Sequence, residues 1–160
     1  MTVLGTWAVG NIALGSILSA QREGEDKYFH QMNALWNGVN LTLAGVSFYT
    51  LSKQDPASFG LYESMQESRK LQNILLFNTG LDVGYVAGGL YLRERGKTET
   101  DPVKAARYRG WGKSIVLQGA FLFAFDLTAY FILKSDNEFF RPIIEGISFS
   151  GNSLGWRMQF

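Results

Sequence analysis

Cysteine is absent from the 160-residue chain, so disulfides, thiolate metal sites and cysteine nucleophiles are all excluded. Charge is scarce as well: charged residues make up 18% of the chain, against about 25% in soluble domains. The formal net charge of +1 gives no electrostatic reason to expect a nucleic-acid partner. No HExxH, GxSxG, Walker or GxGxxG pattern occurs in a context that would give it meaning. We therefore expect no enzyme, no cofactor and no metal.

The charges that are present lie between four long apolar stretches. Residues 1–21 and 28–52 carry no charged side chain, 71–92 carry only Asp82, and 114–133 carry only Asp126. A helix needs about 20 such residues to cross a bilayer. The sequence therefore predicts a transmembrane domain over residues 1–135, whose partner is the lipid bilayer. Its predicted spans are approximately 2–20, 34–52, 71–92 and 112–133.

The polar segments between the stretches predict an orientation. Segments 22–27 and 93–113 hold more lysine and arginine than 53–70 and the C-terminal tail. By the positive-inside rule, both termini lie outside, and we expect a bacterial inner membrane. The first stretch also has the length of a signal peptide, but no basic region precedes it, which favours a mature helix. Asp101-Pro102 predicts a helix start, with Asp as N-cap, for a short helix leading into the fourth span.

An internal repeat relates the first stretch to the third and the second to the fourth. Val9-Gly10-x-x-Ala13-x-Gly15 has the spacing of Val83-Gly84-x-x-Ala87-x-Gly89, and Asn37-Gly38 aligns with Gln118-Gly119. Either the chain is duplicated, or helices rich in Gly, Ala and Leu match by chance. Duplication predicts two helical hairpins of the same orientation. The glycines, Gly80 and Gly88 included, predict close helix packing. The Gly-rich faces, together with a hairpin predicted near the C-terminus, also suit a homo-oligomer or a protein partner.

Polar side chains occur at the predicted membrane depth. The candidate intramembrane cluster consists of Asp82, Asp126, Asn78, Gln118, Asn37, Asn40 and Asn11. Because an ionised carboxylate in hydrocarbon costs several kcal/mol, these groups either line an ion or proton path or satisfy one another inside the bundle. His30, the one histidine, is a candidate interfacial switch. A haem-ligand role is disfavoured because no second histidine is available.

The tail over residues 136–160 reads differently from the spans. Trp156, Met158 and Phe160 alternate with polar or small residues, which predicts a β-hairpin over 147–160. An outer-membrane barrel is the alternative, but residues 74–77 and 121–125 are apolar on both strand faces. We therefore predict an all-α membrane protein: a four-transmembrane-helix bundle of two hairpin repeats, with a short C-terminal β-hairpin.

Three segments carry a likeness to known sequences: residues 28–33 (YFHQMN), 76–85 (LFNTGLDVGY) and 118–126. Through them the chain resembles a family of uncharacterised helical membrane proteins from Bacteroidota-type bacteria. The resemblance implies a four-span fold and an exported N-terminus but no known activity. Two functional hypotheses follow. The first is a non-catalytic structural or accessory subunit, and the alternative is a small channel or carrier for ions, protons or a polar solute that uses the intramembrane carboxylates.

Overall fold

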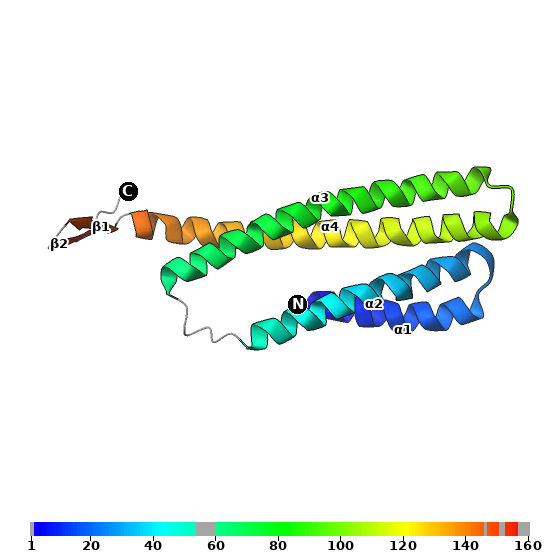
Figure 1. The fold of residues 1–160 in the computed structure, drawn as a ribbon, viewed down its shortest axis with the longest axis horizontal. Coiled ribbons are helices and arrows are strands. Elements are labelled where there is room, and N and C mark those ends of the chain that lie inside the picture. The colour runs from blue at the N-terminus through cyan, green and yellow to red at the C-terminus, as the bar shows by residue number, and fades with distance from the viewer. Residues whose placement is uncertain (1, 54–59, 146, 151–152, 157–160) are drawn as a thin grey trace.

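The protein is an extended helical molecule with a short strand pair at its C-terminal end (Figure 1). The computed structural model describes residues 2–53, 60–145, 147–150 and 153–156. In chain order the elements are α1 (Thr2–Gln21), α2 (Gly24–Ser52), α3 (Leu61–Thr98), α4 (Pro102–Glu145), β1 (Ile147–Ser150) and β2 (Ser153–Trp156).

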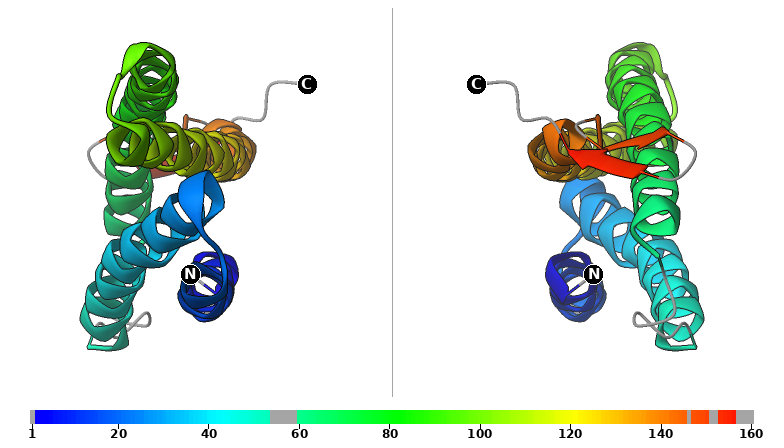
Figure 2. Two further views of the ribbon diagram at one scale, coloured as in Figure 1. Left: turned by 90° about the vertical axis from the view of Figure 1, so that its right-hand side faces the viewer. Right: turned by 90° about the vertical axis from the view of Figure 1, so that its left-hand side faces the viewer.

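The helices form two antiparallel hairpins, α1–α2 and α3–α4, whose tight turns lie at the same end of the molecule (Figure 1). Helix α2 packs on both α1 and α4, and α4 packs on α3. The second helices of the two hairpins are therefore in the centre and run in the same direction, while α1 and α3 lie outside them (Figure 2). Away from the turns the two hairpins diverge (Figure 1).

Local chemistry explains two of the helix starts. Gly24 has a φ of 59°, a conformation that favours glycine, and it opens α2 after the short connection from α1. Asp101 caps α4, because its Oδ1 accepts hydrogen bonds from the backbone N–H of Val103 at 2.8 Å and of Lys104 at 3.2 Å. These bonds hold the pKa of Asp101 below its usual range. The predicted start at Asp101-Pro102 is confirmed.

The helices are longer than the predicted spans. Helix α4 is continuous from Pro102, so the segment predicted as a short separate helix is its first turns. It also continues to Glu145, well into the predicted tail. Beyond it, β1 and β2 pair antiparallel, with Ile147 opposite Trp156 and Ser150 opposite Ser153. Met158 and Phe160, part of the predicted hairpin, lie outside the described residues.

Two helices in the described part of the chain are long and apolar enough to cross a membrane. The qualifying segments are Val3–Gln21 in α1 and Pro102–Ser135 in α4. Length and composition alone are weak evidence, since a buried core helix or a signal sequence can meet the same criterion. The predicted spans in α2 and α3 fall short of it in the described residues.

The polarity of the molecule is inverted relative to a water-soluble bundle. Among the residues whose exposure is described, the buried hydrophobic ones are only Ala8 and Ala105. The buried polar and charged residues are Asn33, Asn37, Asn40, Thr79, Asp82, Ser114, Gln118 and Asp126. Large apolar side chains point outward instead, including Phe48 and Phe77, each 68% exposed.

Candidate functional site

A hydrogen-bonded polar core joins the two hairpins, with Gln118 of α4 at its centre. The Gln118 side chain accepts a hydrogen bond from Trp7 Nε1 on α1 at 3.0 Å and donates one to Asn33 Oδ1 on α2 at 3.1 Å. Ser114 Oγ donates to the same Asn33 oxygen at 2.5 Å. Three helices are thus connected through one buried amide, and each of these bonds is strengthened by the low dielectric around it.

Helical spacing explains why these groups meet. Asn33, Asn37 and Asn40 lie at i, i+4 and i+7 on one face of α2, and Ser114 and Gln118 lie at i and i+4 on α4. Asn37, Ser114 and Gln118 are fully buried. The packing of α2 against α4 turns the two polar faces toward each other. Asn33 and Ser114 are absent from the predicted cluster, although this spacing was a signal that could have identified them.

The two acids lie between α3 and α4. Asp82 is 3% exposed and Asp126 is 8% exposed. The Asn78 side chain lies beside the Asp126 carboxyl group, and the two carboxyl groups are close enough to interact electrostatically. Gly119 allows α4 to approach here, because a Cβ at this position would lie 3.2 Å from the Asp82 carbonyl oxygen.

Not every predicted site residue belongs to this interior. Asn11 is half-buried and donates to the Trp7 backbone carbonyl of its own helix at 2.8 Å. It lines an apolar groove of about 560 Å³ between α1 and α4, together with Trp7, Phe121 and four other residues. Trp7 and Phe121 stack there, with ring centroids 3.9 Å apart. His30 is half-buried too, and its ring packs edge-on to Phe29 at 5.1 Å.

Three buried polar atoms of the core have no hydrogen-bond partner among the described residues. They are Asn37 Oδ1, Asn40 Nδ2 and Asp82 Oδ2. Buried polar groups are nearly always hydrogen-bonded, so each such atom calls for an explanation. The described residues contain no group of three or more histidine or acidic side chains that could hold a metal ion.

The glycines divide into two kinds. A Cβ at Gly15 would lie 2.7 Å from the His30 carbonyl oxygen, and one at Gly89 would lie 2.8 Å from that of Gly112. Both therefore allow close packing inside a hairpin. In contrast, a Cβ would meet nothing within 4 Å at Gly10, Gly80, Gly84 or Gly88. The prediction that these four serve close packing is wrong within the described part of the chain, because Gly80, Gly84 and Gly88 are exposed on α3 and Gly10 borders the α1–α4 groove.

An ion-pair cluster closes the molecule near the turns. Glu25 at the start of α2 pairs with Arg109 at 2.9 Å and with Lys113 at 2.5 Å, both on α4. Arg109 also donates to the Gly96 carbonyl of α3 at 2.9 Å. Partial burial raises the pKa of Glu25, but the hydrogen bonds and charges of Lys113 and Arg109 outweigh it and leave the pKa below its usual value.

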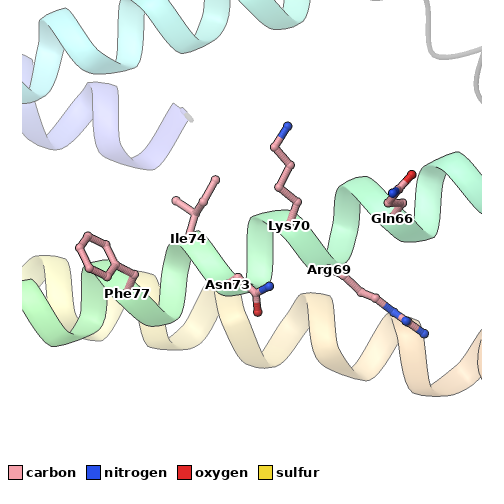
Figure 3. Close-up of a pocket in the computed structure, with 6 residues that line it drawn as sticks. All are labelled: Gln66, Arg69, Lys70, Asn73, Ile74 and Phe77. Carbon is pink, nitrogen blue, oxygen red and sulfur yellow. The ribbon is translucent and has the colours of Figure 1, made fainter.

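A second, open groove lies along α3, near the opposite end, and is lined by residues of α3. It measures about 560 Å³ and is lined by Gln66, Arg69, Lys70, Asn73, Ile74 and Phe77. Lys70 and Ile74 point from α3 toward the first hairpin, whereas Arg69 and Asn73 point toward α4 (Figure 3). Its basic side chains are exposed, and Lys70 forms a surface pair with Glu67 at 3.7 Å. Neither this groove nor the α1–α4 groove is lined by Asp82 or Asp126.

A model of a protein family described as a family of unknown function, DUF6992, matches residues 3–127. This is most of the chain, so the protein belongs to that family. No curated protein and no solved structure matches it. The matched region contains the whole polar core, including Asn33, Asp82, Gln118 and Asp126.

Proposed function

We propose that this member of DUF6992 is an integral protein of a bacterial inner membrane, crossed by all four helices, and acts as a non-catalytic structural or accessory subunit. The inverted polarity carries the membrane part of the proposal. Polar groups buried inside a bundle and large apolar side chains outside it suit a hydrocarbon solvent, in which every polar group must find an internal partner.

The composition of α2 and α3 is compatible with spanning. Their average hydropathy is lowered by residues that point inward, such as Asn37 of α2 and Asp82 of α3. Their outward positions are apolar, as at Val39 (57% exposed) and Phe77 (68% exposed). A bilayer contacts only the outward face, and 29 residues of α2 extend about 43 Å, more than the hydrocarbon thickness of about 30 Å.

Membrane placement and orientation can be tested together because the chain has no native cysteine. Single cysteines at Arg22, Lys53 and Lys97 report on the three connections between helices. We expect a membrane-impermeant maleimide to label K53C in intact cells, and R22C and K97C only after the membrane is opened. Extraction of the protein by alkaline carbonate, or labelling of all three sites in intact cells, would contradict the proposal.

A row of open glycines carries the accessory part of the proposal. Gly80, Gly84 and Gly88 recur every four residues on α3, and each is free of contacts at its missing Cβ. Apolar side chains surround the row, including Phe77 and Tyr91, which are 68% and 65% exposed. In membranes such small-residue rows let a second helix approach closely. We assign this row as the docking face for a helix of another subunit, either a second copy or a different protein.

The docking face is tested by affinity purification from membranes with quantification of co-purifying subunits. We expect Gly84→Leu to reduce the recovered partner at least about tenfold, because the leucine holds the two backbones apart. Gly5→Leu is the matched control, since Gly5 is also free of contacts. A chain ending at residue 146 tests whether the strand pair contributes. Equal recovery with Gly84→Leu and wild type contradicts the docking face.

Transport of an ion or proton is the second candidate, favoured by the unpartnered Asp82 Oδ2 in the middle of the bundle. Intramembrane carboxylates commonly mark such paths. Its test is flux of protons or cations in proteoliposomes. If Asp82→Asn combined with Asp126→Asn leaves a measurable flux unchanged, the carboxylates do not carry it.

A further inference from the structure

We propose that the polar core contains a binding site for a sodium ion where α2, α3 and α4 meet, formed by Asp82, Asn37, Asn40 and Thr79. The site lies inside the bundle, and its occupant would be held by oxygen atoms of a carboxylate, amides and a hydroxyl. The proposal rests on the membrane placement proposed above. It does not require that the protein transport the ion.

Side chains of α2 and α3 reach one another at this level. The rings of Trp36 on α2 and Tyr85 on α3 meet edge to face, with centroids 4.9 Å apart. Since α2 and α3 are antiparallel (Figure 1), one turn beyond Trp36 and one turn before Tyr85 lie at the same height. Those turns carry Asn40 and Asp82, while Asn37 directly follows Trp36.

The side chains offer the right atoms. Asp82 Oδ2 and Asn37 Oδ1 are buried acceptors without partners. Thr79 Oγ1 uses its proton in a 2.8 Å hydrogen bond to the Leu75 carbonyl, which leaves its lone pairs available. Asn40 presents an unpartnered Nδ2, and rotation of its amide by half a turn would present the oxygen instead.

Charge selects a monovalent cation. The buried polar side chains in the described residues include two carboxyl groups but no lysine or arginine. Asp82 is the one carboxyl group among the four proposed ligands, and its Oδ2 is unpartnered, so the site carries a single negative charge. Burying a charge is costly unless an opposite charge compensates it. A single positive ion with a hard preference for oxygen ligands supplies that charge and satisfies both orphaned acceptors.

The site is tested by thermal unfolding of the purified full chain in detergent, followed by tryptophan fluorescence. NaCl is compared with KCl and choline chloride at constant ionic strength. Because a ligand that binds only the folded state stabilises it, we expect a saturable rise in Tm of at least about 3 °C with Na⁺ alone. Asp82→Asn should abolish the rise. Asp26→Asn, which alters an exposed acid on α2, should retain it.

Three results would overturn the site: equal Tm values in the three salts, an equal rise with K⁺, or a sodium response retained in Asp82→Asn. Isothermal titration of NaCl into the wild-type protein in choline buffer keeps the test independent of how well the variant folds, and absence of saturable heat refutes the site. Failure of the membrane placement is separate, since carbonate would then extract a protein that still responds to sodium.

Discussion

The α1–α2 hairpin and the α3–α4 hairpin share a packing rule but differ in chemistry. Gly15 and Gly89 are aligned in the sequence repeat, and at each of them an added Cβ would meet a carbonyl oxygen and a backbone nitrogen of the facing helix. Gly10 and Gly84, also aligned, are both open. The same alignment places Ala8 over Asp82, and both are buried, at 0% and 3% exposure. At this buried position the same backbone pattern thus carries an alanine in the first hairpin and an acid in the second.

The glycine pattern is shared because both hairpins need close contact between their two helices. Among the described residues, the buried acids occur in the second hairpin alone, so close helix packing does not require them. The likeness has a limit: Gly15 packs on His30 and Ala34, and Gly89 packs on Gly112 and Val116. These pairs are shifted by one residue from the alignment of Asn37 with Gln118. The repeat therefore predicts where the glycines pack within each hairpin, but its alignment of the second helices, α2 and α4, is one residue away from the packing register.

The largest effects are expected from leucine at the two packed glycines. Gly15→Leu and Gly89→Leu should each cost at least about 3 kcal/mol of unfolding free energy, because the new side chain meets facing backbone that cannot move aside. Unfolding by SDS in mixed micelles, followed by tryptophan fluorescence, measures this cost. Gly88→Leu is the control, since it meets nothing within 4 Å. A large loss of unfolding free energy in only one of the two leucine variants would show that the two hairpins do not share this packing.

Ala8→Asp tests the difference directly. Ala8 is fully buried, and an acid there would lose its hydration, so we expect a loss of about 3 kcal/mol in the same SDS assay. Ala8→Ser is the control for added volume and polarity. If Ala8→Asp were as stable as wild type, the first hairpin would accommodate an acid equally well, and the contrast would have no energetic basis.

Gln118→Ala removes the amide that joins the hairpins. It leaves Trp7 Nε1 without its partner and Asn33 with one donor fewer, so we expect a loss of about 2 to 4 kcal/mol. Asn73→Ala, on the exposed part of α3, should change stability by less than about 0.5 kcal/mol. Equal stability of the two variants would mean that the polar core does not hold the hairpins together.

Glu25→Gln weakens the second link between the hairpins, and its effect depends on pH. At pH 7 we expect a loss of about 1 kcal/mol, measured by SDS unfolding, because the cluster is half exposed. Folding lowers the pKa of Glu25 from 4.5, so its contribution is present above that value and is lost as the pH falls through the lower folded pKa. The difference in unfolding free energy between wild type and variant should therefore be constant from neutral pH down to mildly acidic conditions and should disappear below pH 4.5. A difference that widens in acid would contradict this.

The smallest effect is expected at Asn11. Among the described residues, its side chain hydrogen-bonds to the backbone of its own helix alone, so Asn11→Ala should change stability by less than about 0.5 kcal/mol. Asn33→Ala, which removes an acceptor shared by Ser114 and Gln118, is the contrasting variant. A larger loss of stability in Asn11→Ala than in Asn33→Ala would show that Asn11 contributes to the polar core.

Much of the candidate site was predictable because polar side chains on otherwise apolar helices are expected to face the interior of the bundle. Asp82, Asp126, Asn37 and Gln118 are all interior, as their mid-stretch positions suggest. Asn11 was misassigned, since position along a helix does not reveal which face a residue occupies relative to its neighbours. The packing prediction for Gly80, Gly84 and Gly88 was wrong for the same reason. Their spacing is typical of packed helices, but α4 lies on the other side of α3.

The sequence by itself determined the helical character, the start of α4 at Asp101-Pro102 and the separation of charge from apolar stretches, because these depend on local propensity and composition. Only the tertiary structure decided that α2 and α4 form the centre and that Gln118 meets Asn33 and Trp7. It also decided which glycines are packed and which are open. Such features depend on the rotation and neighbours of each helix, and contacts between residues more than 80 positions apart, such as Ser114 with Asn33 (81 apart), leave no local signal in the chain.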